Sequence, residues 1–102
     1  MKYKLKYQTR GKVETYIAMT TSVIAMMQDQ LYAESELNTI LENISLEVQS
    51  QAEASTKGLT ANPVCEIEGR YLTVRNTHGR EILLVWFDWV YDKGQHPQVR
   101  KL

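Results

Sequence analysis

The chain is poor in the residues from which catalytic and metal sites are usually built. It has one cysteine, Cys65, and two histidines, His78 and His96, which lie far apart. A single cysteine excludes an internal disulfide, and this spacing does not match a metal-binding motif. Glycines occur singly, without a GxGxxG or GKS/T string, so a phosphate-binding loop is not expected. We therefore predict a non-enzymatic protein with no catalytic residues, no metal and no cofactor.

Long apolar runs are also missing. The longest, over 23–27 and 82–87, fall far short of the ~20 residues that cross a bilayer, and the N-terminus lacks the continuous apolar stretch of a signal peptide. The 12 basic and 12 acidic side chains balance to a net charge of zero, whereas dedicated duplex-DNA binders are usually basic. We expect a cytoplasmic protein in a reducing compartment, with no membrane partner.

What the chain does have is a strong separation of charge. Between residues 13 and 56 every charged side chain is acidic. Five of the 12 basic residues precede that segment: Lys2, Lys4, Lys6, Arg10 and Lys12. The first three alternate with Tyr3, Leu5 and Tyr7, which predicts a strand with lysines on one face and apolar side chains on the other.

This basic strand has two interpretations. It is the chain's candidate nucleic-acid contact, since single-stranded nucleic acids bind to basic grooves that also carry aromatic side chains. The neighbouring tyrosines point away from the lysines, however, and only Tyr16, expected beside Lys4, shares their face. The other interpretation is a solvated edge strand that its lysines protect from aggregation.

Turn chemistry predicts a hairpin at the N-terminus. Strands over 2–8 and 12–18 are joined by Thr9-Arg10-Gly11, with the glycine in the left-handed conformation. The resulting register places Tyr7 opposite Val13 on the apolar face.

A second hairpin is predicted near the C-terminus. A strand over 64–75, bent at Gly69, is followed by a turn with Gly79 in the left-handed conformation and by a strand over 80–91. The predicted register pairs Arg75 with Glu81, Val74 with Ile82, and Leu72 with Leu84.

The segment between the hairpins has helical spacing. One apolar stripe, with a start cap at 20–22, ends near Leu31, and a second runs from Leu37 to Val48. The two stripes are out of phase, so we expect a turn over 33–36. Residues 43–49 also alternate as a strand would, but we prefer helix there because the apolar set with helical spacing, from Leu37 to Val48, is longer.

These elements predict an α+β fold of order ββααββ. Its antiparallel sheet has about four strands, in two hairpins, with one or two helices packed on it. Residues 1–92 form the single domain and residues 93–102 a polar C-terminal tail.

The last strand is apolar on both of its faces. Its odd positions, from Leu83 to Tyr91, are expected to pack against the helices. The even positions, with the preceding strand, form the candidate partner interface: Leu72, Val74, Ile82, Leu84 and Trp86. Either a segment of the same chain covers this patch or another molecule does.

Together these features predict a small protein-interaction module. It acts as a homodimer, or as a regulator or inhibitor that docks on a larger protein; the alternative is a nucleic-acid-binding module that uses the basic strand. Asp88 is expected to form a salt bridge with that strand. Cys65 is expected to be a small buried apolar residue, with its pKa raised by Glu66 and Glu68.

Overall fold

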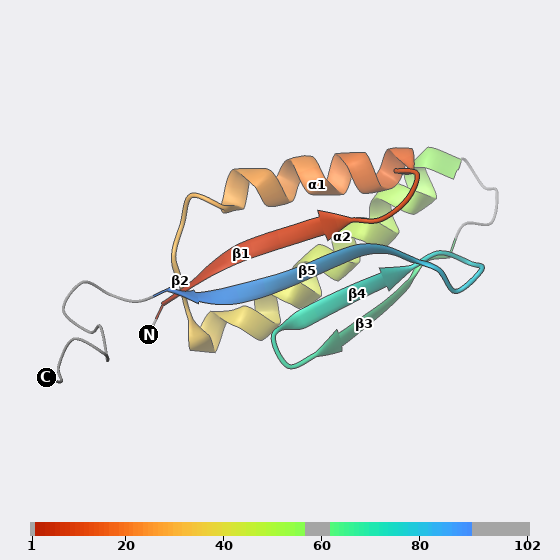
Figure 1. Ribbon diagram of the computed structural model, residues 1–102. Helices are drawn as coiled ribbons and strands as arrows, with labels where there is room; N and C mark the ends of the chain where they lie inside the picture. Colours follow the sequence, from red (N-terminus) through yellow and green to blue (C-terminus); the bar gives the residue numbers. More distant parts are fainter. Residues whose placement is uncertain (1, 57–61, 91–102) are drawn as a thin grey trace, which may run out of the picture.

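Two helices cover one face of a five-stranded antiparallel sheet in the computed structural model, which describes residues 2–56 and 62–90 (Figure 1). The elements are β1 (Lys2–Thr9), α1 (Thr15–Met27), β2 (Tyr32–Ala33), the 3₁₀ turn η1 (Glu34–Glu36), α2 (Leu37–Thr56), β3 (Val64–Glu68), β4 (Tyr71–Arg75) and β5 (Glu81–Val90). The strand order in the sheet is β2-β1-β5-β4-β3. The predicted α+β class is confirmed, with five strands in a different order. The predicted polar tail, 93–102, lies outside the described residues.

The predicted N-terminal hairpin is wrong. β1 pairs with β5 along its whole length, from Lys2 opposite Val90 to Thr9 opposite Leu83, and residues 12–18 form no strand. The buried side chains of α1 explain the difference, because they recur at helical and not at strand spacing. They are Tyr16, Ile17, Thr20 and Ile24. Gly11 has the expected positive φ, 67°, but in the loop that leads into this helix.

The helical segment largely follows its prediction. α1 begins at Thr15, before the cap expected at 20–22. The turn expected over 33–36 is present as β2 and η1, where the Ala33 N–H donates to the Glu36 carboxylate over 2.8 Å. Residues 43–49 belong to α2, so the helix preferred there over a strand is confirmed.

The C-terminal strands differ from the predicted ones, and the difference changes which side chains lie on the surface of the protein. The bent strand predicted over 64–75 is a hairpin of β3 and β4, with Gly69 at φ 61° between them. The pairing of Arg75 with Glu81 is confirmed, but beyond it one additional residue of β5, Ile82, forms a β-bulge. The register is therefore shifted by one: Val74 lies opposite Leu83, Thr73 opposite Leu84, and Leu72 opposite Val85. A slip of one residue moves every following side chain to the other face of the sheet.

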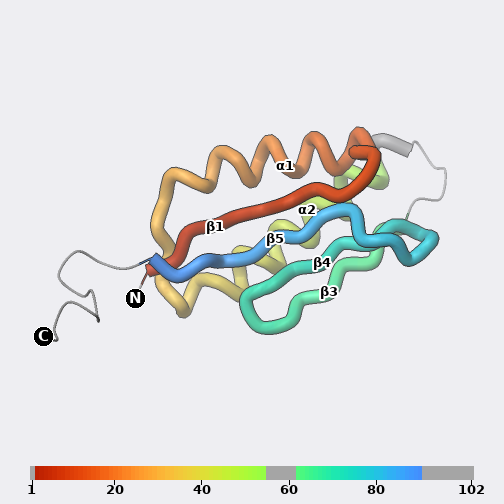
Figure 2. Tube along the Cα trace, viewed as in Figure 1, coloured from red at the N-terminus to blue at the C-terminus, as the bar shows by residue number. Residues whose placement is uncertain are grey.

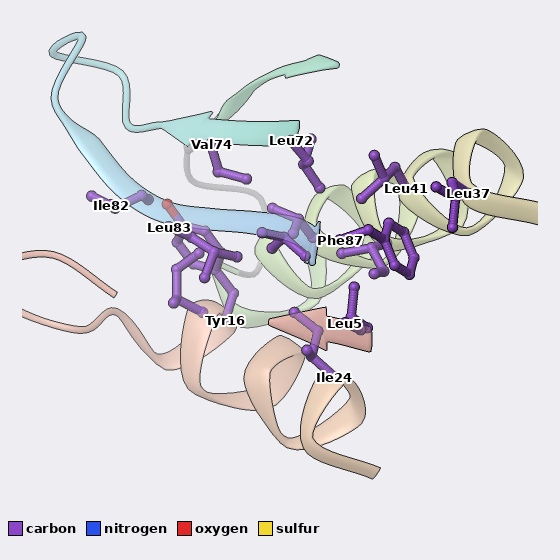
Figure 3. Packing of buried hydrophobic residues seen from close by; sticks show 14 of the residues in the cluster. Leu5, Tyr16, Ile24, Leu37, Leu41, Leu72, Val74, Ile82, Leu83 and Phe87 are labelled. Carbon is purple, nitrogen blue, oxygen red and sulfur yellow. The ribbon is translucent and has the colours of Figure 1, made fainter. Parts of the chain in front are cut away.

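The core lies between the sheet and the helices. α1 packs along β1, and α2 packs against α1, β4 and β3. Figure 2 shows α2 running diagonally behind β5. Figure 3 shows Leu72 and Val74 pointing from β4 toward the helices, and both are fully buried. Burying one such side chain stabilises the fold by about 1.5–3 kcal/mol. Among the described helices, none is both long and apolar enough to span a membrane.

Candidate interaction surface

The sheet face opposite the helices is the most distinctive surface of the protein. No helix or strand within residues 2–56 and 62–90 covers it (Figure 1). Side chains alternate along a strand, so the burial of one set of positions assigns the other set to this face. We call it the open face; it comprises Lys2, Lys4, Lys6 and Gln8 of β1, Leu84, Trp86 and Asp88 of β5, Tyr71, Thr73 and Arg75 of β4, and Val64, Glu66 and Glu68 of β3.

The strand register arranges these side chains in rows across the sheet. One row contains Lys6, Trp86, Tyr71 and Glu68, in that order. Tyr71 is 49% exposed, and Trp86 is half-buried. Strands are spaced by about 4.8 Å, so Lys6 and Glu68 lie roughly 14 Å apart and do not neutralise each other directly. An aromatic centre thus separates a basic edge from an acidic edge.

The next row repeats this arrangement with smaller side chains. It contains Gln8, half-buried Leu84, Thr73 and Glu66. Leu84 therefore extends the apolar centre along β5 from Trp86, with Gln8 and Thr73 as its own neighbours on β1 and β4.

Several charged side chains of the open face, and others near the bulge of β5, form ion pairs within the chain. The Lys6 Nζ lies 3.7 Å from the Asp88 Oδ2, which confirms the salt bridge expected between Asp88 and the lysine strand. Both side chains are about half exposed, and such surface pairs contribute about 0–1 kcal/mol. Near the bulge, four alternating charges contact one another in series across the sheet: Arg10, Glu81, Arg75 and Glu66.

The structure divides the five residues of the predicted partner interface between two places. Leu72, Val74 and Ile82 are buried in the core, and only Leu84 and Trp86 lie on the open face. The cause is the bulge at Ile82, which the predicted register did not include. It also brings Tyr71 next to Trp86, a neighbour that the sequence analysis missed.

The basic residues of the predicted nucleic-acid contact are all exposed. Lys2, Lys4 and Lys6 project from β1 on the open face, and Arg10 and Lys12 lie in the loop that follows. The expectation about their aromatic neighbours is wrong: Tyr16 is buried in the core, whereas Trp86 lies beside Lys6 on the same face. The aromatic residue was missed because β1 pairs with β5, and not with residues 12–18.

α1 carries a second exposed apolar surface. Met19, Val23 and Met26 follow one another at helical spacing on its outer side, with exposed fractions of 48%, 39% and 77%. The helix contains no charged residue. This stripe is narrow and lacks the charged borders of the open face, which makes it a useful control surface in experiments.

Cys65 points to the helix side of β3 and does not belong to the open face. It is half-buried, with its Sγ 4.0 Å from the Ser45 carbonyl oxygen. Burial raises the pKa of the Cys65 thiol, so the expected direction is confirmed, but the cause is desolvation and not Glu66 or Glu68. Within 2–56 and 62–90, no three His, Cys, Asp or Glu side chains gather as metal ligands would.

Comparison of the chain with known protein families, with curated proteins and with solved structures finds no match. The chemistry of the open face is therefore the main indication of what the protein binds. Its exposed aromatic side chains offer dispersion and apolar contact, and its borders offer charge of both signs. Aromatic side chains with polar and charged neighbours are also found together in protein interfaces.

Proposed function

We propose that this protein is a non-enzymatic protein-interaction module that binds its partner through the open face. The observation that supports the proposal is the row in which Trp86 and Tyr71 stand side by side between Lys6 and Glu68. Aromatic side chains at the centre of a patch, with polar side chains around them, are the usual anatomy of a protein interface. The partner is either a second copy or a larger protein that the module regulates or inhibits.

The charged groups of the open face support binding better than catalysis. Catalytic acids and bases are usually desolvated and set beside a group whose charge shifts their pKa. Here the carboxylates of Asp88 and Glu66 are well exposed and contact basic side chains, Lys6 and Arg75. Such pairs fix the borders of a binding surface and contribute to its selectivity.

A nucleic-acid-binding role is the second candidate, and one observation favours it. Trp86 lies beside Lys6, so the face holds the combination of a base-stacking platform and a phosphate-binding cation. The acidic side chains weigh against it, because Asp88, Glu66 and Glu68 on the same face repel phosphates. We therefore rank it below protein binding.

A pair of glutamate variants tests the proposal. Trp86→Glu places a charge at the centre of the open face, and Met26→Glu places one on the outer side of α1 as a control. Proteins captured from a soluble extract by the immobilised wild type are purified and titrated against each variant, and self-association is measured by sedimentation. We expect Trp86→Glu to abolish binding and Met26→Glu to preserve it.

The same variants define the contradicting results. Retention of every interaction by Trp86→Glu would exclude the open face as the binding surface. A labelled single-stranded oligonucleotide that the wild type binds, with an affinity that falls steeply with salt and is lost in Trp86→Glu, would put the nucleic-acid role first. Circular dichroism establishes that each variant is folded, as expected for changes at exposed or half-buried positions.

A further inference from the structure

We propose that the partner of the open face is a second copy of this chain, stacked face to face about a two-fold axis that runs parallel to the strands. This inference rests on the proposed interaction function and goes beyond it by specifying the partner and the geometry. It follows from the way charge is distributed across the sheet: β1 bears Lys2, Lys4 and Lys6, and β3 bears Glu66 and Glu68.

Symmetry decides which strands meet. A two-fold axis parallel to the strands reverses the order of the strands across the sheet but leaves positions along them unchanged. It therefore lays β1 of one copy over β3 of the other, with Lys6 over Glu68, while Lys2 and Lys4 lie beyond the end of the β3–β4 hairpin. An axis perpendicular to the strands lays β1 over β1, lysine over lysine, which is repulsive. Only the first arrangement is electrostatically complementary.

The register specifies the individual contacts. β1, β5, β4 and β3 are consecutive in the sheet, so the axis that exchanges β1 and β3 lies between β5 and β4. Because Lys6, Trp86, Tyr71 and Glu68 share a row, Lys6 faces the partner subunit's Glu68, and Trp86 faces the partner subunit's Tyr71. In the next row, Leu84 faces the partner subunit's Thr73. Each contact occurs twice.

The dimensions of the sheet fit this stacking. Packed sheets lie about 10 Å apart with their strands roughly aligned, a distance that a lysine and a glutamate span together. Four strands about 4.8 Å apart and about 17 Å long in β3 and β4 present roughly 320 Å² of sheet plane per copy. That is well below the ~800 Å² per partner of a stable complex, so the dimer is weak and dissociates on dilution.

Charge reversal provides a test that a general loss of affinity cannot imitate. In Lys6→Glu both symmetric contacts become glutamate against glutamate, and in Glu68→Lys both become lysine against lysine. Each variant alone should dimerise at least about tenfold more weakly than the wild type. In an equimolar mixture of the two variants, the Glu68 kept by Lys6→Glu faces the Lys6 kept by Glu68→Lys, and the two substituted side chains, which also have opposite charges, face each other. The mixture should therefore form a heterodimer. The double variant should form a homodimer again.

Matched controls carry the same charge changes elsewhere. Lys12→Glu lies in the loop after β1, and Glu42→Lys lies on α2, behind the sheet; both residues are exposed. Neither control alone, nor their mixture, should alter the dimerisation of the wild type. Circular dichroism verifies folding, because Lys6→Glu also removes the ion pair with Asp88.

The outcomes separate this inference from the function on which it rests. A wild type that stays monomeric up to about 1 mM, a concentration at which even a complex with a millimolar Kd is populated, overturns the homodimer. The interaction function then survives if a purified partner binds the wild type but not Trp86→Glu. It fails if no partner distinguishes the two proteins. If the wild type dimerises but the equimolar mixture of the two variants does not, the proposed axis is overturned. If Lys6→Glu forms heterodimers with the wild type and not with Glu68→Lys, the axis is perpendicular to the strands.

Discussion

Leu72 and Leu84 provide the sharpest test of how the sheet is built. Sequence patterning pairs them on one face, but the bulge at Ile82 places Leu72 in the core, where it is fully buried, and Leu84 on the open face, half-buried. Truncating a buried leucine to alanine removes its transfer free energy and leaves a cavity, at a cost of about 2–5 kcal/mol. At Leu84 the open face admits water, so no enclosed cavity forms, and we expect a cost of less than about 1.5 kcal/mol.

Urea unfolding followed by far-ultraviolet circular dichroism measures the loss in the free energy of unfolding for both variants. Each variant carries the same leucine-to-alanine change. The free energy of unfolding of a domain of this size is about 5–15 kcal/mol, so Leu72→Ala should move the unfolding midpoint far more than Leu84→Ala does. Measurements at low protein concentration keep self-association out of the comparison. Equal losses in the two variants, or a greater loss at Leu84, would refute the bulged register and with it the composition of the open face.

Two further predictions concern the turns and the thiol. Gly11→Val and Gly79→Val should each lower the free energy of unfolding by about 1–2 kcal/mol, because both glycines have positive φ. The Arg80 guanidinium lies where the new side chain of Gly11→Val would be, but it is the far end of a flexible side chain and can move aside, so the two costs should be similar. Wild-type unfolding midpoints would contradict this. Burial raises the pKa of the Cys65 thiol above its ordinary value, so the thiolate absorbance should appear at a higher pH in the folded than in the unfolded chain. The protonated thiol then favours the folded state: this contribution is complete below the unfolded pKa and is lost as the pH rises through the folded pKa, and Cys65→Ser should remove that part of the alkaline destabilisation. An alkaline profile unchanged in Cys65→Ser would contradict the assignment.

Local patterns in the sequence predicted the parts of the fold that local interactions determine. The alternation of lysine and tyrosine identified β1, the spacing from Leu37 to Val48 identified the first part of α2, and the positive φ of Gly79 followed from turn chemistry. A salt bridge between Asp88 and the lysine strand was also predicted from charge, and in the structure Lys6 is the lysine that forms it.

The parts that were wrong depend on contacts between distant residues. β1 pairs with β5, almost the whole chain away, and a turn-like loop before α1 imitated the start of a hairpin. The bulge at Ile82 changes the register by one residue without any glycine or proline to mark it. As a result Tyr71, a central residue of the open face, was not foreseen, and Leu72 and Val74 were placed on the wrong side of the sheet.

Hydroxyl-radical footprinting at several protein concentrations shows whether copies of this chain associate through the open face. The oxidation rates of Trp86 and Tyr71, on the open face, are compared with that of Met26, on the outer side of α1. The account predicts that Trp86 and Tyr71 become protected as the concentration of the 11.8 kDa chain rises, while Met26 reacts at a constant rate. Protection of Met26 with unchanged oxidation of Trp86 and Tyr71 would contradict it, because the copies would then associate through α1 and leave the open face in water.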